Sequence, residues 1–300
     1  MMVESSVLGI FASLVAALLF GLYPVPRRYV EFGIADYMLS MSLGVTVTAL
    51  AINFFFGSSF LDLSLFHWAL AISAGMLWAV GTVFYVYSVD CIGVGRATPI
   101  KNITAAFGVI FGLIVFGEYK GMEGLEFVYL GLGTFLVVLA GKYLGSVQGR
   151  HGIKRPSWQA NLITPGFIGN GKGSTMAAGG LLAFITSLLY GLQSIPVRAL
   201  SSSAGILEFL PAVGIGALLT SFLVDLLLTS THTWMDVSYD GHLIAAFSGA
   251  LWTGGFLGLV FGVKVIGLAV SWPIAMSSTV FAVLYGLLVG EEIEFGKYVV

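Results

Sequence analysis

The sequence predicts an all-α polytopic membrane protein, built as two inverted five-helix repeats of which nine complete spans are present. Three observations predict this class. Of the 300 residues, 58% are hydrophobic and 9% are charged, with a mean hydropathy of +0.98, a composition that soluble domains do not have. Several long stretches carry no Asp, Glu, Lys or Arg. Segments of the second half also repeat segments of the first half in the same order.

Nine charge-free stretches mark the expected transmembrane helices. A helix needs roughly 20 apolar residues to cross the hydrocarbon core, and a charge at its centre costs about 2.5–3.5 kcal/mol. The stretches cover residues 5–26, 37–61, 63–89, 102–117, 127–141, 173–197, 209–224, 241–263 and 265–290. They are apolar at odd and even positions alike, whereas strands of a membrane barrel alternate. Glu4 stands where a signal peptide would be basic, so we expect the first stretch to be a retained span.

Charge and cysteine content exclude other classes. The chain has 13 Lys and Arg against 15 Asp and Glu, so it lacks the basic surface that nucleic-acid binding requires. The single cysteine, Cys91, forbids an internal disulfide and a cysteine metal cluster. The four histidines stand at span ends or in the central loop, and no nucleophile and base are paired. We therefore expect no enzyme activity, no cofactor and no bound metal.

One long loop, residues 145–175, divides the chain. It holds seven glycines and two prolines, which is typical of a flexible linker. The predicted units are a first repeat of five helices (residues 1–144), the linker (145–175), and a second repeat (176–300) with helices six to nine and the start of a tenth. Only eight residues follow Glu292, so we expect the tenth helix to be missing or truncated in this chain.

The repeat is visible in two blocks. Residues 18–28 and 188–198 are identical at six of eleven positions, and residues 75–118 and 249–292 at 16 of 44 without a gap. A composition this biased would give roughly one identity in ten by chance. Because five spans, an odd number, precede the linker, the second repeat is expected to enter the membrane in the opposite orientation. Secondary transporters have this architecture, with the substrate near the midplane between the repeats.

The repeated motifs resemble a known family. The paired Gly-x-Leu-Trp segments (Gly75 to Trp78, Gly249 to Trp252), the Ile-Gly and Pro-Ile joints, and the closing Gly-Glu and Glu-Glu pairs look like the drug/metabolite transporter superfamily. Within it, the chain is most similar to the glucose/ribose uptake branch, the carbohydrate transporters. The resemblance implies a ten-helix carrier with alternating access that moves a small polar solute, often a sugar, coupled to protons.

Four residues at repeated positions are candidates for substrate contact. Tyr23 and Gln193 occupy the same repeat position and offer hydrogen bonds from inside a span. Trp78 and Trp252 recur at matching positions, expected one turn into the third and eighth helices, where an indole can stack on a pyranose face and donate its N–H. The alternatives are hydrogen bonding between helices for the first pair and a place in the interfacial aromatic belt for the second.

Lys101 and Asn102 are further candidates for substrate binding, because polar residues at membrane depth are functional hypotheses by default. Both are expected at the start of the fourth helix, just after Pro99, where Lys101 could instead extend its ammonium to the interface. Pro26 and Pro196 are expected at the ends of the first and sixth helices. These two prolines, with Pro99 and Pro273 in the repeated joints, are candidate hinges or gates.

Charge and proton coupling has five candidates. Glu118 and Glu292 close the fourth and ninth helices at matching positions, where they could instead fix the turn that follows. Asp225 is the better intramembrane acid, although it has no repeat partner. Arg28 and Arg198 align in the repeat, and a basic cavity for a nucleotide sugar or a phosphate could draw only on them and on Lys101.

The expected function is secondary transport of a small carbohydrate across a bilayer, most readily the plasma membrane although an organelle membrane is open, with a proton as possible co-substrate. Carriers of amino acids, nucleotide sugars or drugs, and a receptor or assembly protein that no longer transports, remain alternatives. Orientation stays open. The alternate loops carry ten and three Lys and Arg residues, which favours an external amino terminus, whereas the resemblance implies termini in the cytoplasm.

Overall fold

The computed structural model describes residues 2–56, 59–146, 172–228 and 234–288, and within these ranges it is helical throughout, without strands. The α-helices are α1 (Met2–Leu22), α2 (Ile34–Phe55), α3 (Leu65–Ile92), α4 (Val94–Lys101), α5 (Thr104–Ile110), α6 (Gly124–Ser146), α7 (Lys172–Ser203), α8 (Ile206–Leu228), α9 (Tyr239–Ile266), α10 (Leu268–Met276) and α11 (Thr279–Leu288). Short turns of helix join them: η1 (Val25–Tyr29), η2 (Phe60–Asp62), η3 (Phe111–Val115), η4 (Glu118–Gly121) and η6 (Trp234–Asp236).

Nine spans in the described part of the chain are long and apolar enough to cross a membrane. Two of them combine consecutive helices, because Val94–Val115 contains α4, α5 and η3, and Leu268–Leu288 contains α10 and α11. The chain is therefore an all-α, multi-pass integral membrane protein, as its composition predicts. The linker expected at 145–175 is bordered by α6, which extends to Ser146, and α7, which begins at Lys172. Residues 147–171, Glu292 and the segment expected to start a tenth helix lie outside the described residues.

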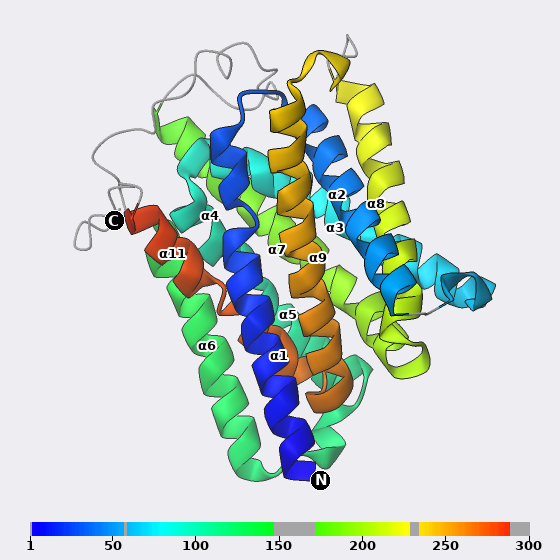
Figure 1. Cartoon of the computed structure of the whole chain (residues 1–300). Coiled ribbons are helices and arrows are strands. Elements are labelled where there is room, and N and C mark those ends of the chain that lie inside the picture. The colour runs from blue at the N-terminus through cyan, green and yellow to red at the C-terminus, as the bar shows by residue number, and fades with distance from the viewer. Residues whose placement is uncertain (1, 57–58, 147–171, 229–233, 289–300) are drawn as a thin grey trace.

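Helices from the two halves of the chain interleave in the bundle. α1 packs against α9 and α10, α3 packs against α7 and α8, and α2 packs against α8 and α9. Figure 1 shows α1 and α9 side by side along the length of the bundle, with α6 at its edge. Small residues allow the close contacts, because a Cβ added at Gly258 of α9 would lie 2.7 Å from the carbonyl oxygen of Ala12 in α1.

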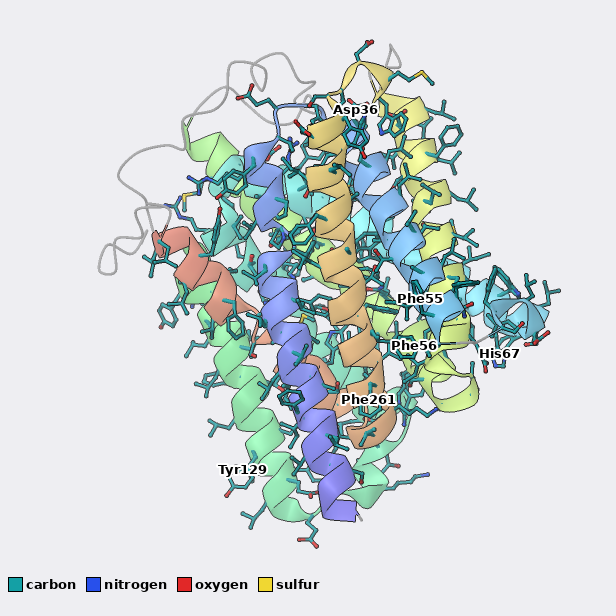
Figure 2. The ribbon with its side chains drawn as sticks, in the orientation of Figure 1. Asp36, Phe55, Phe56, His67, Tyr129 and Phe261 are labelled. Atoms are coloured by element: carbon teal, nitrogen blue, oxygen red, sulfur yellow. The ribbon has the colours of Figure 1, made fainter. Side chains whose placement is uncertain are left out.

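The outside of the bundle is apolar. Phe55 at the end of α2 is 80% exposed and Tyr129 on α6 is 69% exposed, and Figure 2 shows both of these side chains on the outside of the bundle. In a membrane-spanning bundle these side chains contact lipid instead of water, so their exposure on the outside of the bundle does not destabilise the protein.

Both composite spans start and break in the same way. α4 follows Gly93 and α10 follows Gly267, and these glycines have φ of 83° and 82°, a left-handed conformation that other residues rarely adopt. The α-helix then breaks at residues 102–103 in the first span and at 277–278 in the second. The prediction that Lys101 and Asn102 stand at the start of a helix is wrong, because the span begins at Val94 and places both residues near its middle.

The four prolines lie inside helical turns. Pro99 is within α4, Pro273 is within α10, and both precede the breaks by a few residues. Pro26 is buried in η1, beyond the end of α1. Pro196 does not end its helix as expected, since α7 continues to Ser203. A proline removes one hydrogen bond from a helix without necessarily ending it when neighbouring helices hold the two parts in place.

Candidate functional site

A central cavity lies between helices from both halves of the chain. Its walls come from α1 and the turn after it, α3, α4, α7, α9 and α10. The lining residues are Phe20, Tyr23, Trp78, Lys101, Tyr190, Gln193, Trp252, Phe256, Leu259, Trp272 and Met276. Five of the six residues that the sequence nominates for substrate contact therefore meet in one place, and Asn102 is the exception.

Stacked aromatic rings form one wall of the cavity. The rings of Trp78 and Trp252 lie with centroids 4.1 Å apart and an angle of 33° between their planes, and Phe256 continues the stack at 4.8 Å from Trp252. Trp78 stands 13 residues after the start of α3 and 14 before its end, and Trp252 has the same place in α9. Both side chains are almost completely buried. The alternative that they belong to an interfacial belt is wrong, since they stand at mid-span.

Three hydrogen-bond donors around the cavity have no acceptor among the described residues. They are the indole Nε1 atoms of Trp78 and Trp272 and the amide Nε2 of Gln193. Buried donors are nearly always paired, because an unpaired one loses its hydration without compensation. Three unpaired donors at one cavity indicate a site for a ligand, or for ordered water, that carries several acceptor oxygens.

Lys101 stands at the end of α4 with its side chain buried in a cage of tyrosines. Its Nζ lies 5.0 Å from the ring centroid of Tyr85, 5.7 Å from that of Tyr190 and 5.8 Å from that of Tyr23. Lys101 is only 2% exposed, so the alternative that its ammonium extends to the membrane interface is wrong. No carboxylate of the described residues pairs with this ammonium, and the ring faces supply the favourable electrostatics instead.

Hydroxyl groups hold the tyrosine cage in place. The hydroxyl of Tyr190 lies 2.7 Å from Thr82 Oγ1 and 3.4 Å from the hydroxyl of Tyr23. Tyr85 makes a 2.6 Å hydrogen bond to Thr98 Oγ1. The cage therefore links α1, α3, α4 and α7 around the amine.

Asn102 faces away from the cavity and joins the two broken spans. Its Nδ2 lies 2.7 Å from the carbonyl oxygen of Met276 and 2.8 Å from both Ser278 Oγ and Thr279 Oγ1. These acceptors stand at the break between α10 and α11. The geometry gives Asn102 the role of fastening one break to the other.

Two ion pairs stand at opposite ends of the bundle. Arg27 in η1 bonds Asp90 near the end of α3, with Nη2 to Oδ2 at 2.9 Å, and it donates to the carbonyl oxygen of Phe32. Arg198 near the end of α7 lies 2.6 Å from Glu118 in η4. α1 rises from the amino terminus at the bottom of Figure 1 and ends near Arg27, whereas the chain enters α6 from η4 at the bottom. We call these the Arg27 end and the Arg198 end.

Glu118 also begins α10. Its carboxylate accepts hydrogen bonds from the backbone N–H groups of Leu268 at 2.9 Å and Ala269 at 2.8 Å. A carboxylate at a helix N-terminus satisfies free donors and interacts favourably with the helix dipole. Of the two roles considered for Glu118, proton coupling and fixing the chain, the second fits this conformation. The segment that Glu118 fixes is the start of α10, however, and not the turn after Glu118 itself.

The other charged candidates lie away from the cavity. Arg28 is exposed at the end of η1, and Asp225 is buried in α8 without lining the cavity. Glu292 lies outside the described residues. No three His, Cys, Asp or Glu side chains of the described ranges gather as metal ligands would.

Sequence reasoning missed several residues of the site. Tyr190 aligns with Phe20 in the repeat, so its place beside the cavity could have been read from the same block that selected Tyr23. Arg27, rather than the repeated Arg28, makes the buried ion pair, and the sequence carries no signal that separates the two. Trp272 and Met276 have the dissimilar repeat partners Thr98 and Asn102, so repeat identity could not select them.

Comparisons with known proteins agree with this architecture. The family model "Sugar transport protein" matches residues 11–297. The glucose uptake protein GlcU of Bacillus subtilis is 24% identical over 258 residues, which cover 84% of this chain and 79% of the relative. A protein of Priestia megaterium named "Probable glucose uptake protein GlcU" is 23% identical over 95% of this chain and 90% of its own length. A solved crystal structure aligns over 98% of this chain and 90% of its own, with a TM-score of 0.59 at 16% identity, and so shares the fold.

Proposed function

Since the chain belongs to the sugar transport protein family, we propose that it carries a small, glucose- or ribose-like carbohydrate across the membrane as a proton-coupled secondary transporter. In the relatives the sugar named is glucose. The plasma membrane is the proposed location. The observation that carries the proposal is the mid-span cavity, whose aromatic wall and unpaired donors stand on helices from both halves of the chain.

The cavity is chemically matched to a monosaccharide. A pyranose ring has apolar C–H faces that pack on an indole, which Trp78 and Trp252 present side by side. Its hydroxyl oxygens accept hydrogen bonds, and Trp78, Trp272 and Gln193 hold free donors. A few such contacts supply the roughly −4 kcal/mol of a millimolar site.

Alternating access is the proposed mechanism. The cavity lies between the Arg27 end and the Arg198 end, and each end has an ion pair in this conformation. Opening one ion pair while the other stays closed would expose the cavity to one side at a time. The two composite spans, each started by a left-handed glycine and broken near its middle, support the proposed pair of inverted repeats at residues 1–144 and 176–300.

The charges of the cavity favour a sugar over a phosphate-bearing substrate. Among the three cations nominated for a basic cavity, only Lys101 lines it, because Arg198 is paired with Glu118 and Arg28 is exposed at one end. A nucleotide sugar carries two phosphate charges, which one lysine does not balance.

The test is sugar counterflow with the purified 300-residue chain in liposomes. Vesicles loaded with unlabelled glucose or ribose should take up the same radiolabelled sugar transiently, and an inward proton gradient should drive accumulation without preloading. Counterflow that saturates for either sugar supports the carrier. Binding of sugar, detected by a melting-temperature shift, without any counterflow would instead support the receptor alternative.

A further inference from the structure

A proton-coupled carrier needs an ionisable group with three properties. The group must contact the substrate cavity, be shielded from water while both ends are closed, and reach water when either end opens. Proton movement along an ordinary surface carboxylate would not depend on the sugar.

Neither the described carboxylates that the sequence nominates, Glu118 and Asp225, nor Asp90 meets these conditions. Glu118 is occupied by Arg198 and by the amides that begin α10, and Asp90 is occupied by Arg27. Asp225 does not line the cavity. The described histidines bond outside it, His242 to Ser40 and His67 to Ser64 and Ser203.

Lys101 meets the first two conditions, because it lines the cavity and is 2% exposed. It also stands at the break in the middle of its span, where opening of either end would bring water to its amine. The titratable groups that face its amine are tyrosines, namely Tyr23 beyond α1, Tyr85 on α3 and Tyr190 on α7. α10 contributes Trp272 and Met276 to the same cavity, and these do not titrate.

Sugar and proton would favour each other at this amine. An ammonium has three N–H donors, and in a closed cavity without a carboxylate partner they need acceptor oxygens. The tyrosine rings stabilise the ammonium only through their faces, and a bound sugar would add hydroxyl oxygens. If the sugar stabilises the ammonium, the proton strengthens sugar binding by the same factor, because linkage is reciprocal. A carrier that moves loaded with both, or with neither, is a symporter.

We infer that Lys101 is the proton-coupling group of this carrier. A proton from water on one side adds to the lone pair of Nζ as the sugar enters, and it returns to water on the other side after the sugar leaves. The inference rests on the proposed sugar transport, and it assigns proton coupling to an amine instead of the carboxylates that the sequence nominates.

The experiment compares wild type, Lys101→Arg and Lys101→Gln in proteoliposomes. Arginine keeps the charge but does not release its proton, and glutamine keeps hydrogen bonding without the charge. We expect gradient-driven accumulation, expressed as a ratio to the counterflow of the same variant, to fall by roughly tenfold or more in both variants. Lowering the pH should lower the half-saturation concentration of the wild type and leave that of both variants unchanged. Lys142→Arg and Lys142→Gln, on the exposed face of α6, are the matched controls and should behave as wild type.

Each other outcome has a defined meaning. Full accumulation by Lys101→Arg would overturn the inference and leave Lys101 as a fixed positive charge. A strong preference of the wild type for uronic acids over glucose, abolished in Lys101→Gln, would also overturn it and would assign Lys101 to anion binding. Loss of sugar binding in both variants, measured through tryptophan fluorescence, would assign it to substrate binding alone. Wild-type counterflow without any response to a proton gradient would overturn coupling but not transport. Absence of wild-type counterflow would overturn the proposed function itself.

Discussion

At the scale of single residues, the unpaired indole donors give the sharpest test of the cavity. Replacing Trp78 with phenylalanine keeps an aromatic face but removes an unpaired Nε1, whereas replacing Trp252 with phenylalanine removes part of the stacked surface. The loss of one hydrogen bond, about 1 kcal/mol, corresponds to roughly a fivefold increase in half-saturation. We expect this increase in counterflow for Trp78→Phe, a smaller one for Trp252→Phe and the largest one for the pair.

The control for this prediction is Trp68→Phe. Trp68 stands on α3 like Trp78 but packs against Phe60 outside the cavity, so its replacement should leave half-saturation unchanged. If Trp78→Phe and Trp252→Phe also left half-saturation unchanged, the two tryptophans would be packing residues and not substrate contacts.

Asn102 makes a second residue-level prediction, on stability instead of affinity. Asn102→Ala removes the donor shared by the carbonyl of Met276 and the hydroxyls at the second break and should lower the free energy of unfolding by about 1–3 kcal/mol. Thr104→Val is the control, because Thr104 is buried beside the first break, next to Asn102, and its hydroxyl has no partner among the described residues. Melting curves in detergent should show a clear decrease for Asn102→Ala only. Equal decreases would mean that the break is sensitive to any change of packing.

At the scale of elements, the start of α10 depends on a residue 150 positions earlier. Glu118→Ala removes two hydrogen bonds to the helix N-terminus and the bond to Arg198. We expect a loss of about 2 kcal/mol or more of stability, because a cap and a half-buried ion pair disappear together. Glu126→Ala is the matched control, since Glu126 bonds only the amide of Glu123 at the exposed start of α6. Its melting temperature should decrease less than that of Glu118→Ala. The reverse order would show that Glu118 does not hold α10.

Hydropathy predicted where the spans lie but not how the fourth one is built. Its charge-free stretch begins at residue 102 because Arg96 and Lys101 interrupt the apolar pattern, whereas the span begins at Val94. A lysine inside a span is tolerated here because three tyrosine rings from other helices surround it, and no local pattern reports such a tertiary cage. The positions of the helix breaks were missed for a related reason. Asn102 at the first break bonds groups at the second break that are 174 or more residues away, and a local sequence pattern does not report such a contact.

Position in the repeat, in contrast, predicted much of the cavity. Tyr23 with Gln193, and Trp78 with Trp252, were selected because they occupy equivalent positions, and the structure brings all four to one place. Trp272 and Lys101 line the same space, but their repeat partners, Thr98 and Ala275, do not, so position in the repeat gave no signal for them.

At the scale of the whole molecule, the proposed alternating access predicts that the Arg27 end and the Arg198 end are coupled. Cys91 is the single cysteine of the chain, and it adjoins Asp90 where α3 meets Gly179 of α7. Its rate of reaction with a polar maleimide therefore reports on opening of the Arg27 end. Arg27→Gln should raise this rate severalfold, because it removes the ion pair that fastens α3 to η1. Arg198→Gln should lower the rate, because loosening the Arg198 end shifts the population towards a state in which the Arg27 end is closed.

Opposite signs distinguish alternating access from simple loosening. Cys91→Ser supplies the background of the labelling, and Lys142→Gln, a charge removed from the exposed surface of α6, should leave the rate unchanged. A saturating sugar that stabilises a closed intermediate should lower the rate in wild type and in Arg27→Gln alike. If both arginine variants accelerated labelling, the ion pairs would be independent structural contacts. A decrease in Arg198→Gln can arise only if the two ends exclude each other's opening, which is the property that a carrier needs and a channel lacks.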